Sequence, residues 1–138
     1  MINLETVKAK VLTVLEAAWT TPTVTPVEWP RAALDSKELA EWIRPDVLNL
    51  AAAPQRRGQD EGDMELQVHI FTRTELLTNT YRPEELAALL GAVFDQADLA
   101  TGAPIDYGLR FSEAQTRSLP EVDGVSSLLF SCPFRVEA

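Results

Sequence analysis

The chain contains one histidine and one cysteine, the side chains best suited to nucleophilic catalysis and transition-metal binding. His69 occupies a polar position of the alternating segment Met64–Ile70, which places it on the solvent side of a strand. Cys132 follows Leu128 and Phe130 at two-residue steps, as a small core residue would. A pair of His69 and Cys132 would lack the third group that orients a catalytic base. We therefore expect no catalytic residue and no enzymatic activity.

Metal and cofactor sites are not indicated either. Asp60, Glu61 and Asp63 lie close together, but the run lacks the alternating oxygen ligands and closing glutamate of a calcium loop. The chain has no Cys/His pair at zinc spacing, no glycine-rich phosphate loop and no dinucleotide fingerprint. The sequence predicts no bound metal and no cofactor.

Composition indicates a single soluble domain over residues 1–138, with 46% hydrophobic and 24% charged residues and no apolar run long enough to span a membrane. The chain has 12 basic and 21 acidic residues and therefore a net charge of −9. This negative charge disfavours nucleic acids and anionic membranes as partners. Acidity indicates solubility first and a docking surface for a basic partner second. The lone cysteine and the absence of a signal-peptide pattern predict folding in a reducing cytoplasm.

Two helices are expected. The first carries an apolar stripe at three- and four-residue steps from Leu4 to Ala18, with Asn3 as its N-cap. The second begins near Pro83, carries a wide apolar stripe that includes Leu90 and Phe94, and ends before Gly102. Each stripe requires a hydrophobic surface to cover it.

Period-two patterns supply that surface as a sheet. The expected strands lie within residues 22–30, 41–50, 64–70, 107–111 and 127–136. Prolines place the first two at an edge, residues 32–40 read as a loop or one helical turn, and the stretch containing Pro120, Asp123 and Gly124 reads as a polar connection. We predict an α+β fold of order α-β-β-β-α-β-β, a mainly antiparallel or mixed sheet with two helices on one face.

Trp19, Trp29 and Trp42 all fall in the first third of a chain with 7% aromatic residues. Packing of the first helix on the sheet would account for them, and anchoring at an interface is the alternative.

The succession of elements resembles the tail terminator (tail completion) proteins of long-tailed bacteriophages and related tail-like particles. The resemblance extends over nearly the whole chain, from the N-terminal amphipathic helix to Glu41–Pro45, Leu66–Phe71, Val93–Phe94 and Ser127–Arg135. It implies a structural virion protein, assembled in the host cytoplasm, whose homohexameric ring caps the tail tube, ends tube polymerisation and presents a surface for head–tail joining. The implied partners are other copies of the chain, the tail tube protein and a head–tail connector. The proline-rich stretch Val24–Pro30 departs from the family's first strand.

Three other functions stay open: another small tail or neck adaptor, a small cytoplasmic enzyme or ligand-binding domain with a dispersed site, and an acidic inhibitor-like protein with one basic partner. The oligomeric mass would separate them.

A hydrophilic segment, Gln55–Asp63, suggests where such a ring would make contacts. It has no apolar residue, so we expect a mobile loop that projects from one end of the sheet. Its charges are segregated, with basic residues first and acidic residues last, as head-to-tail contact between identical copies would require. The candidate interface residues are Arg56, Arg57, Asp60, Glu61 and Asp63. A solvated loop with no partner is the alternative.

Overall fold

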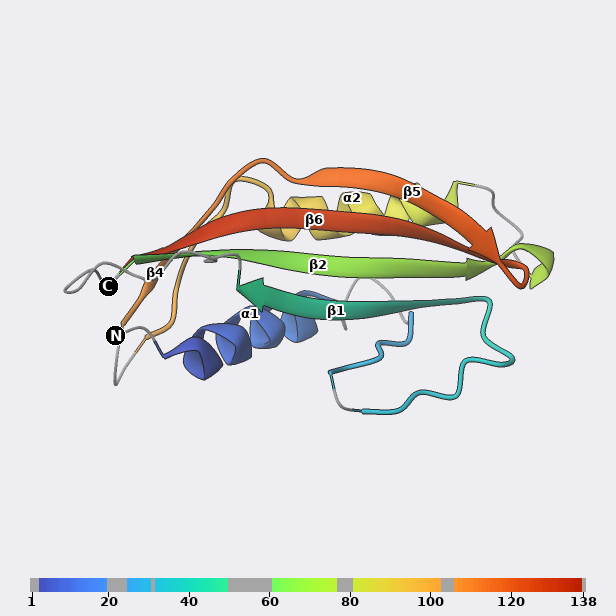
Figure 1. Ribbon diagram of the computed structural model, residues 1–138, viewed down its shortest axis with the longest axis horizontal. Helices are drawn as coiled ribbons and strands as arrows, with labels where there is room; N and C mark the ends of the chain where they lie inside the picture. Colours follow the sequence, from blue (N-terminus) through green and yellow to red (C-terminus); the bar gives the residue numbers. More distant parts are fainter. Residues whose placement is uncertain are drawn as a thin grey trace.

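Two helices lie along one face of an antiparallel sheet in the computed structural model, which describes residues 3–19, 25–30, 32–49, 61–76, 81–102 and 106–137 (Figure 1). The α+β class and the helix-on-sheet arrangement predicted from the sequence are confirmed. The helices of the described residues are α1 (Leu4–Trp19) and α2 (Arg82–Phe94), with a short 3₁₀ turn η1 (Thr74–Leu76) before α2. The strands are β1 (Glu41–Asn49), β2 (Glu61–Arg73), β3 (Asp98–Ala100), β4 (Gly108–Phe111), β5 (Gln115–Val122) and β6 (Val125–Glu137).

The centre of the sheet is the long pair β2 and β6, which are antiparallel over their full 13 residues. The order is β1-β2-β6-β4-β3, and β5 pairs with the stretch of β6 that β4 leaves unpaired. β4 and β5 therefore pair with consecutive stretches of the same edge of β6.

Strict alternation along β2 and β6 divides the sheet into two faces. The helix face buries the core, with Leu66 and Val68 of β2 beside Cys132 and Phe130 of β6. The opposite face, called the open face below, carries Phe71 and His69 beside Ser127 and Leu129.

Both helices form with their expected apolar stripes, but α2 ends at Phe94, well before the expected stop at Gly102, and Asp98–Ala100 form β3 instead. Thr6 N–H donates to Asn3 Oδ1 at 3.2 Å, so Asn3 caps α1. The buried stripe of α1 is Val7, Val11, Leu15 and Trp19, and that of α2 is Leu86, Ala87, Leu90 and Phe94. Both stripes belong to one core cluster with Leu66, Val68, Phe130 and Phe134, which confirms the predicted packing of Leu90 and Phe94.

The element order needs correction, because the described order is α-β-β-α-β-β-β-β. The prediction of a strand within residues 22–30 is wrong for the described part of that segment. There Val27 forms only a single parallel bridge with Ile43. Its prolines remove the donors of a longer ladder. The connection expected around Pro120 is instead β5, joined to β6 by the turn at Asp123 and Gly124, and β3 was not anticipated.

Two boundaries also differ. The expected loop 55–63 is too long at its C-terminal end, because β2 already begins at Glu61, opposite Glu137 of β6. The described residues 32–40 form a loop with a turn at Lys37 and Glu38 and no helical turn. Neither segment showed a period that could have fixed its boundary from the sequence.

Candidate functional site

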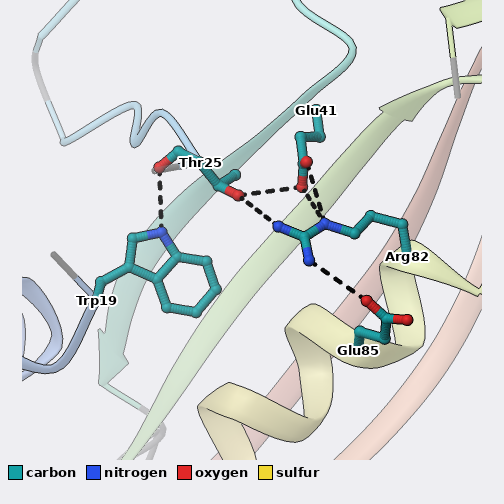
Figure 2. Close-up of polar contacts among 5 residues, drawn as sticks. All are labelled: Trp19, Thr25, Glu41, Arg82 and Glu85. Atoms are coloured by element: carbon teal, nitrogen blue, oxygen red, sulfur yellow. Dashed lines mark hydrogen bonds and ion pairs between the residues drawn. The ribbon is translucent and has the colours of Figure 1, made fainter. Parts of the chain in front are cut away.

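The densest group of polar contacts surrounds Arg82 at the start of α2 (Figure 2). Its Nε donates to both carboxylate oxygens of Glu41, at 3.1 and 2.9 Å, and its Nη1 lies 3.3 Å from Glu85 Oε2. Thr25 Oγ1 donates to Glu41 Oε2 at 3.0 Å, while Trp19 Nε1 donates to the Thr25 carbonyl at 3.1 Å. The group joins the end of α1, the segment before β1, the start of β1 and α2.

This group is arranged for structure rather than for proton transfer. Burial by itself would lower the pKa of Arg82, but hydrogen bonds and charge interactions with Glu41 and Glu85 outweigh it, so the pKa is raised. A guanidinium held in the charged form by two carboxylates neither gives up nor accepts a proton near neutral pH. The residues act as an ionic brace between elements that are distant in the sequence.

Cys132 and His69 lie on opposite faces of the sheet, so they cannot form a dyad. The Cys132 thiol is fully buried and donates to the Ser112 carbonyl at 3.3 Å. Burial, followed by the charges of Asp95 and Glu65, raises its pKa to about 12. Cys132 is therefore a protonated core residue at neutral pH.

His69 lies on the open face, as its alternating position predicted. Partial burial and then the neighbouring Arg44 lower its pKa, against a smaller opposing effect of Asp46. The imidazole is thus neutral at pH 7. Within the described residues, no group of three or more His, Cys, Asp or Glu side chains could hold a metal ion.

The predicted interface residues fall mostly outside the part of the chain that is described. Arg56, Arg57 and Asp60 are not described, and for Glu61 the structure fixes only its place at the start of β2. Asp63 is exposed on β2, with its Oδ1 3.7 Å from Arg135 Nε of β6. The interface hypothesis for this segment stays a prediction, although Asp63 already has a partner within its own subunit.

The open face carries an aromatic cluster that sequence reasoning missed. Trp42 stacks on Phe71 with ring centroids 5.1 Å apart, and Phe71 stacks on His69 at 5.8 Å. The guanidinium of Arg44 lies 5.0 Å from the Phe71 ring centroid, and that of Arg73 lies 5.7 Å from Trp42. These five residues, Trp42, Arg44, His69, Phe71 and Arg73, are called the aromatic–arginine patch below.

Two shallow hollows adjoin this patch. One, of about 300 Å³, lies between Trp42, Phe71 and Arg44 on one side and Pro120, Val122 and Val125 of the β5–β6 hairpin on the other. A second, of about 640 Å³, is bordered by His69, Arg44 and Trp29. Arg44 borders both, so a ligand in either hollow would meet its guanidinium. Aromatic and arginine side chains of this kind are enriched at protein interfaces.

The three tryptophans differ in their surroundings. Trp19 is in the core, Trp29 is partly buried against it, and Trp42 is 7% exposed on the open face. Core packing therefore explains Trp19, whereas Trp42 belongs to the patch. Alternation had placed His69 on the solvent side, but the stacking of Trp42 on its neighbour Phe71 depends on the pairing of β1 with β2, which the sequence does not state.

No protein-family model and no curated protein matches the chain. Four chains of solved structures are similar to it. One of them, a protein without a functional name, superimposes with a TM-score of 0.77 at 16% sequence identity, over 100% of this chain and 98% of its own. That likeness establishes the fold as one that occurs in a second protein over the whole domain. None of the described helices is long and apolar enough to cross a membrane.

Proposed function

We propose that this protein is a structural subunit of a phage tail or tail-like particle, whose ring caps the tail tube, ends tube polymerisation and joins the tail to the head. The proposal combines the family resemblance of the sequence with one observation from the structure. That observation is the aromatic–arginine patch of the open face, where a largely buried aromatic stack lies beside the half-exposed guanidinium of Arg44 and no described helix covers it.

The surface chemistry supports assembly better than catalysis. Among the described residues, the titratable groups with shifted pKa values are a buried thiol, a braced guanidinium and a neutral imidazole, and they lie apart from one another. A catalytic site needs such groups to converge on one reacting atom. The aromatic–arginine patch instead offers the residue types that carry most of the binding energy in protein interfaces.

Deletion of the gene in the producing strain tests the function. A terminator subunit is needed to stop tube growth, so the deletion is expected to give tubes of excessive and variable length without attached heads, measured by electron microscopy. A plasmid copy of the gene should restore the normal length. Tubes of normal length that lack heads would favour the alternative, a neck adaptor. Intact infectious particles would refute a role in tail completion.

The oligomeric state gives a second test. The purified protein, alone or on tubes, is expected to form six-fold rings in negative-stain images. A strictly monomeric protein that does not bind tube ends would contradict the proposal.

A further inference from the structure

We propose that the aromatic–arginine patch of one copy binds the acidic corner at the start of α2 of a second copy. The acidic corner consists of Glu75, Leu76, Tyr81 and Glu84. This inference rests on the proposed function, because it names the contact that would link neighbouring subunits of the ring.

Exposed apolar side chains mark both surfaces. Among the described residues, three large apolar side chains are exposed: Leu76 at 46%, Tyr81 at 71% and Val122 at 65%. Leu76 and Tyr81 belong to the acidic corner, and Val122 borders the hollow beside Trp42 and Phe71. Leu76 and Tyr81 lie on either side of the segment that leads into α2, and Val122 lies at the rim of the hollow, so each surface offers apolar area to a contact.

The charges of the two surfaces are opposite. Around the patch, Arg44, His69, Leu129 and Arg117 form one row across β1, β2, β6 and β5. Arg44 is half exposed and lies 3.8 Å from Glu28, a long ion pair, while Arg117 is exposed at the edge. The row itself holds two arginines and no carboxylate, while Glu28 and Asp46 next to Arg44 offset part of its charge.

The acidic corner is negative because its own basic neighbour is already engaged. Arg82 is bound to Glu41 and Glu85, whereas Glu75 and Glu84 are exposed and make no ion pair with any described residue. A chain with a net charge of −9 therefore presents a positive aromatic surface and a negative apolar one. Electrostatic complementarity of this kind selects the partner and its orientation.

The two surfaces come from different elements, and in the ring of the proposed function the patch of each copy meets the corner of the next, which is a heterologous contact. Heterologous contacts build rings when the rotation closes, whereas a patch that binds itself builds a two-fold dimer. A second copy is the occupant that carries both matching features, the exposed apolar side chains and the unpaired carboxylates.

Charge exchange tests this contact. The patch variant Arg44→Glu and the corner variant Glu75→Arg/Glu84→Arg are each expected to weaken self-association at least about tenfold in sedimentation equilibrium. Mixing the two variants, or combining all three substitutions in one chain, should restore association, because each exchanged surface again meets its opposite. Arg110→Glu, at the other end of the open face, and Glu16→Arg on α1 are the matched controls and should associate like the wild type.

Cysteine trapping covers the case in which a charge variant folds poorly. A mixture of Val122→Cys and Leu76→Cys chains should form a disulfide-linked dimer under mild oxidation, and neither chain should do so alone. The buried native Cys132 serves as the unreactive background. Failure of the mixture to cross-link at the highest soluble concentration, or failure of the exchanged charges to restore association, would overturn the proposed contact.

The outcomes separate this contact from the proposed function. Restored association together with normal tube length after gene deletion keeps the contact and removes the tube-capping function. Overlong tubes after deletion, with no rescue and no cross-link, keep the tail function and remove the contact.

Discussion

Replacement of Phe94 by alanine examines whether α2 is held to the sheet as the structure indicates. Phe94 is fully buried, and its ring centroid lies 5.4 Å from that of Phe111, which in turn stacks on Phe134 at 4.6 Å. The Phe94 carbonyl also accepts the Cys132 thiol at 3.6 Å. The substitution removes the ring that packs the helix against Phe111 of β4.

The magnitude follows from the terms lost. Burial of a phenylalanine side chain contributes about 1.5–3 kcal/mol, and an aromatic pair adds about 0.5–1.5 kcal/mol. Because a core this enclosed relaxes only in part, we expect the free energy of unfolding to fall by about 3–5 kcal/mol. Urea unfolding followed by circular dichroism measures it.

Leu89→Ala on the same helix is the matched control, since Leu89 is only partly buried and its loss should cost clearly less. A loss below about 1 kcal/mol for Phe94→Ala, or equal losses for the two variants, would refute the assigned helix face.

Three further predictions concern titratable groups. Arg82→Met should lower the free energy of unfolding by about 1–3 kcal/mol in urea titrations, because the partly buried Glu41 carboxylate loses its charged donor; an unchanged midpoint would contradict the brace. The Cys132 thiol should resist Ellman's reagent at pH 8 in the folded protein and react fully in denaturant, since its pKa is raised to about 12 and the side chain is buried; fast native labelling would show that it is accessible. The pKa of His69 lies below its ordinary value of 6.5, so the unfolded chain binds the proton first and stability falls as the pH drops below 6.5; His69→Gln should lose less stability over that range, and equal slopes would contradict the burial of the imidazole.

The helices were predictable because their information is local. Asn3 as a cap, the stripe through Val7 and Val11, and Pro83 with two glutamates in the first turn each act within a few residues. The long strands β2 and β6 were also visible, since strict alternation survives wherever one face is buried.

The short strands were not predictable, because their pairing partners lie far away in the sequence. β5 has no buried alternation, its side chains are almost all exposed, and it contains Pro120, so its sequence resembles a loop. It is a strand because β6 extends past the end of β4 and offers unpaired backbone groups. Residues 22–30 show the reverse case, in which apolar residues suggest a strand that the prolines prevent.

The aromatic–arginine patch illustrates the same limit for function. His69 and Phe71 are neighbours on one face of β2, but Trp42, 29 positions before Phe71, joins them only through the register Trp42↔Phe71. Sequence reasoning weighed His69 as an isolated surface residue and Trp42 as one of three tryptophans. Neither residue type nor spacing indicated that they would share a stack.

The two edges of the sheet differ in a way that bears on assembly. The outer side of β1 is closed to a further strand: Ile43 is paired with the segment Pro26–Glu28, Pro45 has no N–H, and the Val47 N–H is bound by the Asp46 carboxylate at 2.8 Å. The outer side of β5 has no described strand beside it. Only Pro120 and the bulge near the turn would hinder the pairing of a further strand there. An edge closed at three consecutive outward positions limits strand addition to the other side of the molecule. Any assembly that enlarges the sheet would therefore add a strand beside β5 or β3, which together form the other edge, whereas contact through the open face leaves both edges as they are. The charge-exchange and cross-linking results for the open face consequently also decide which of these two modes of assembly the subunit uses.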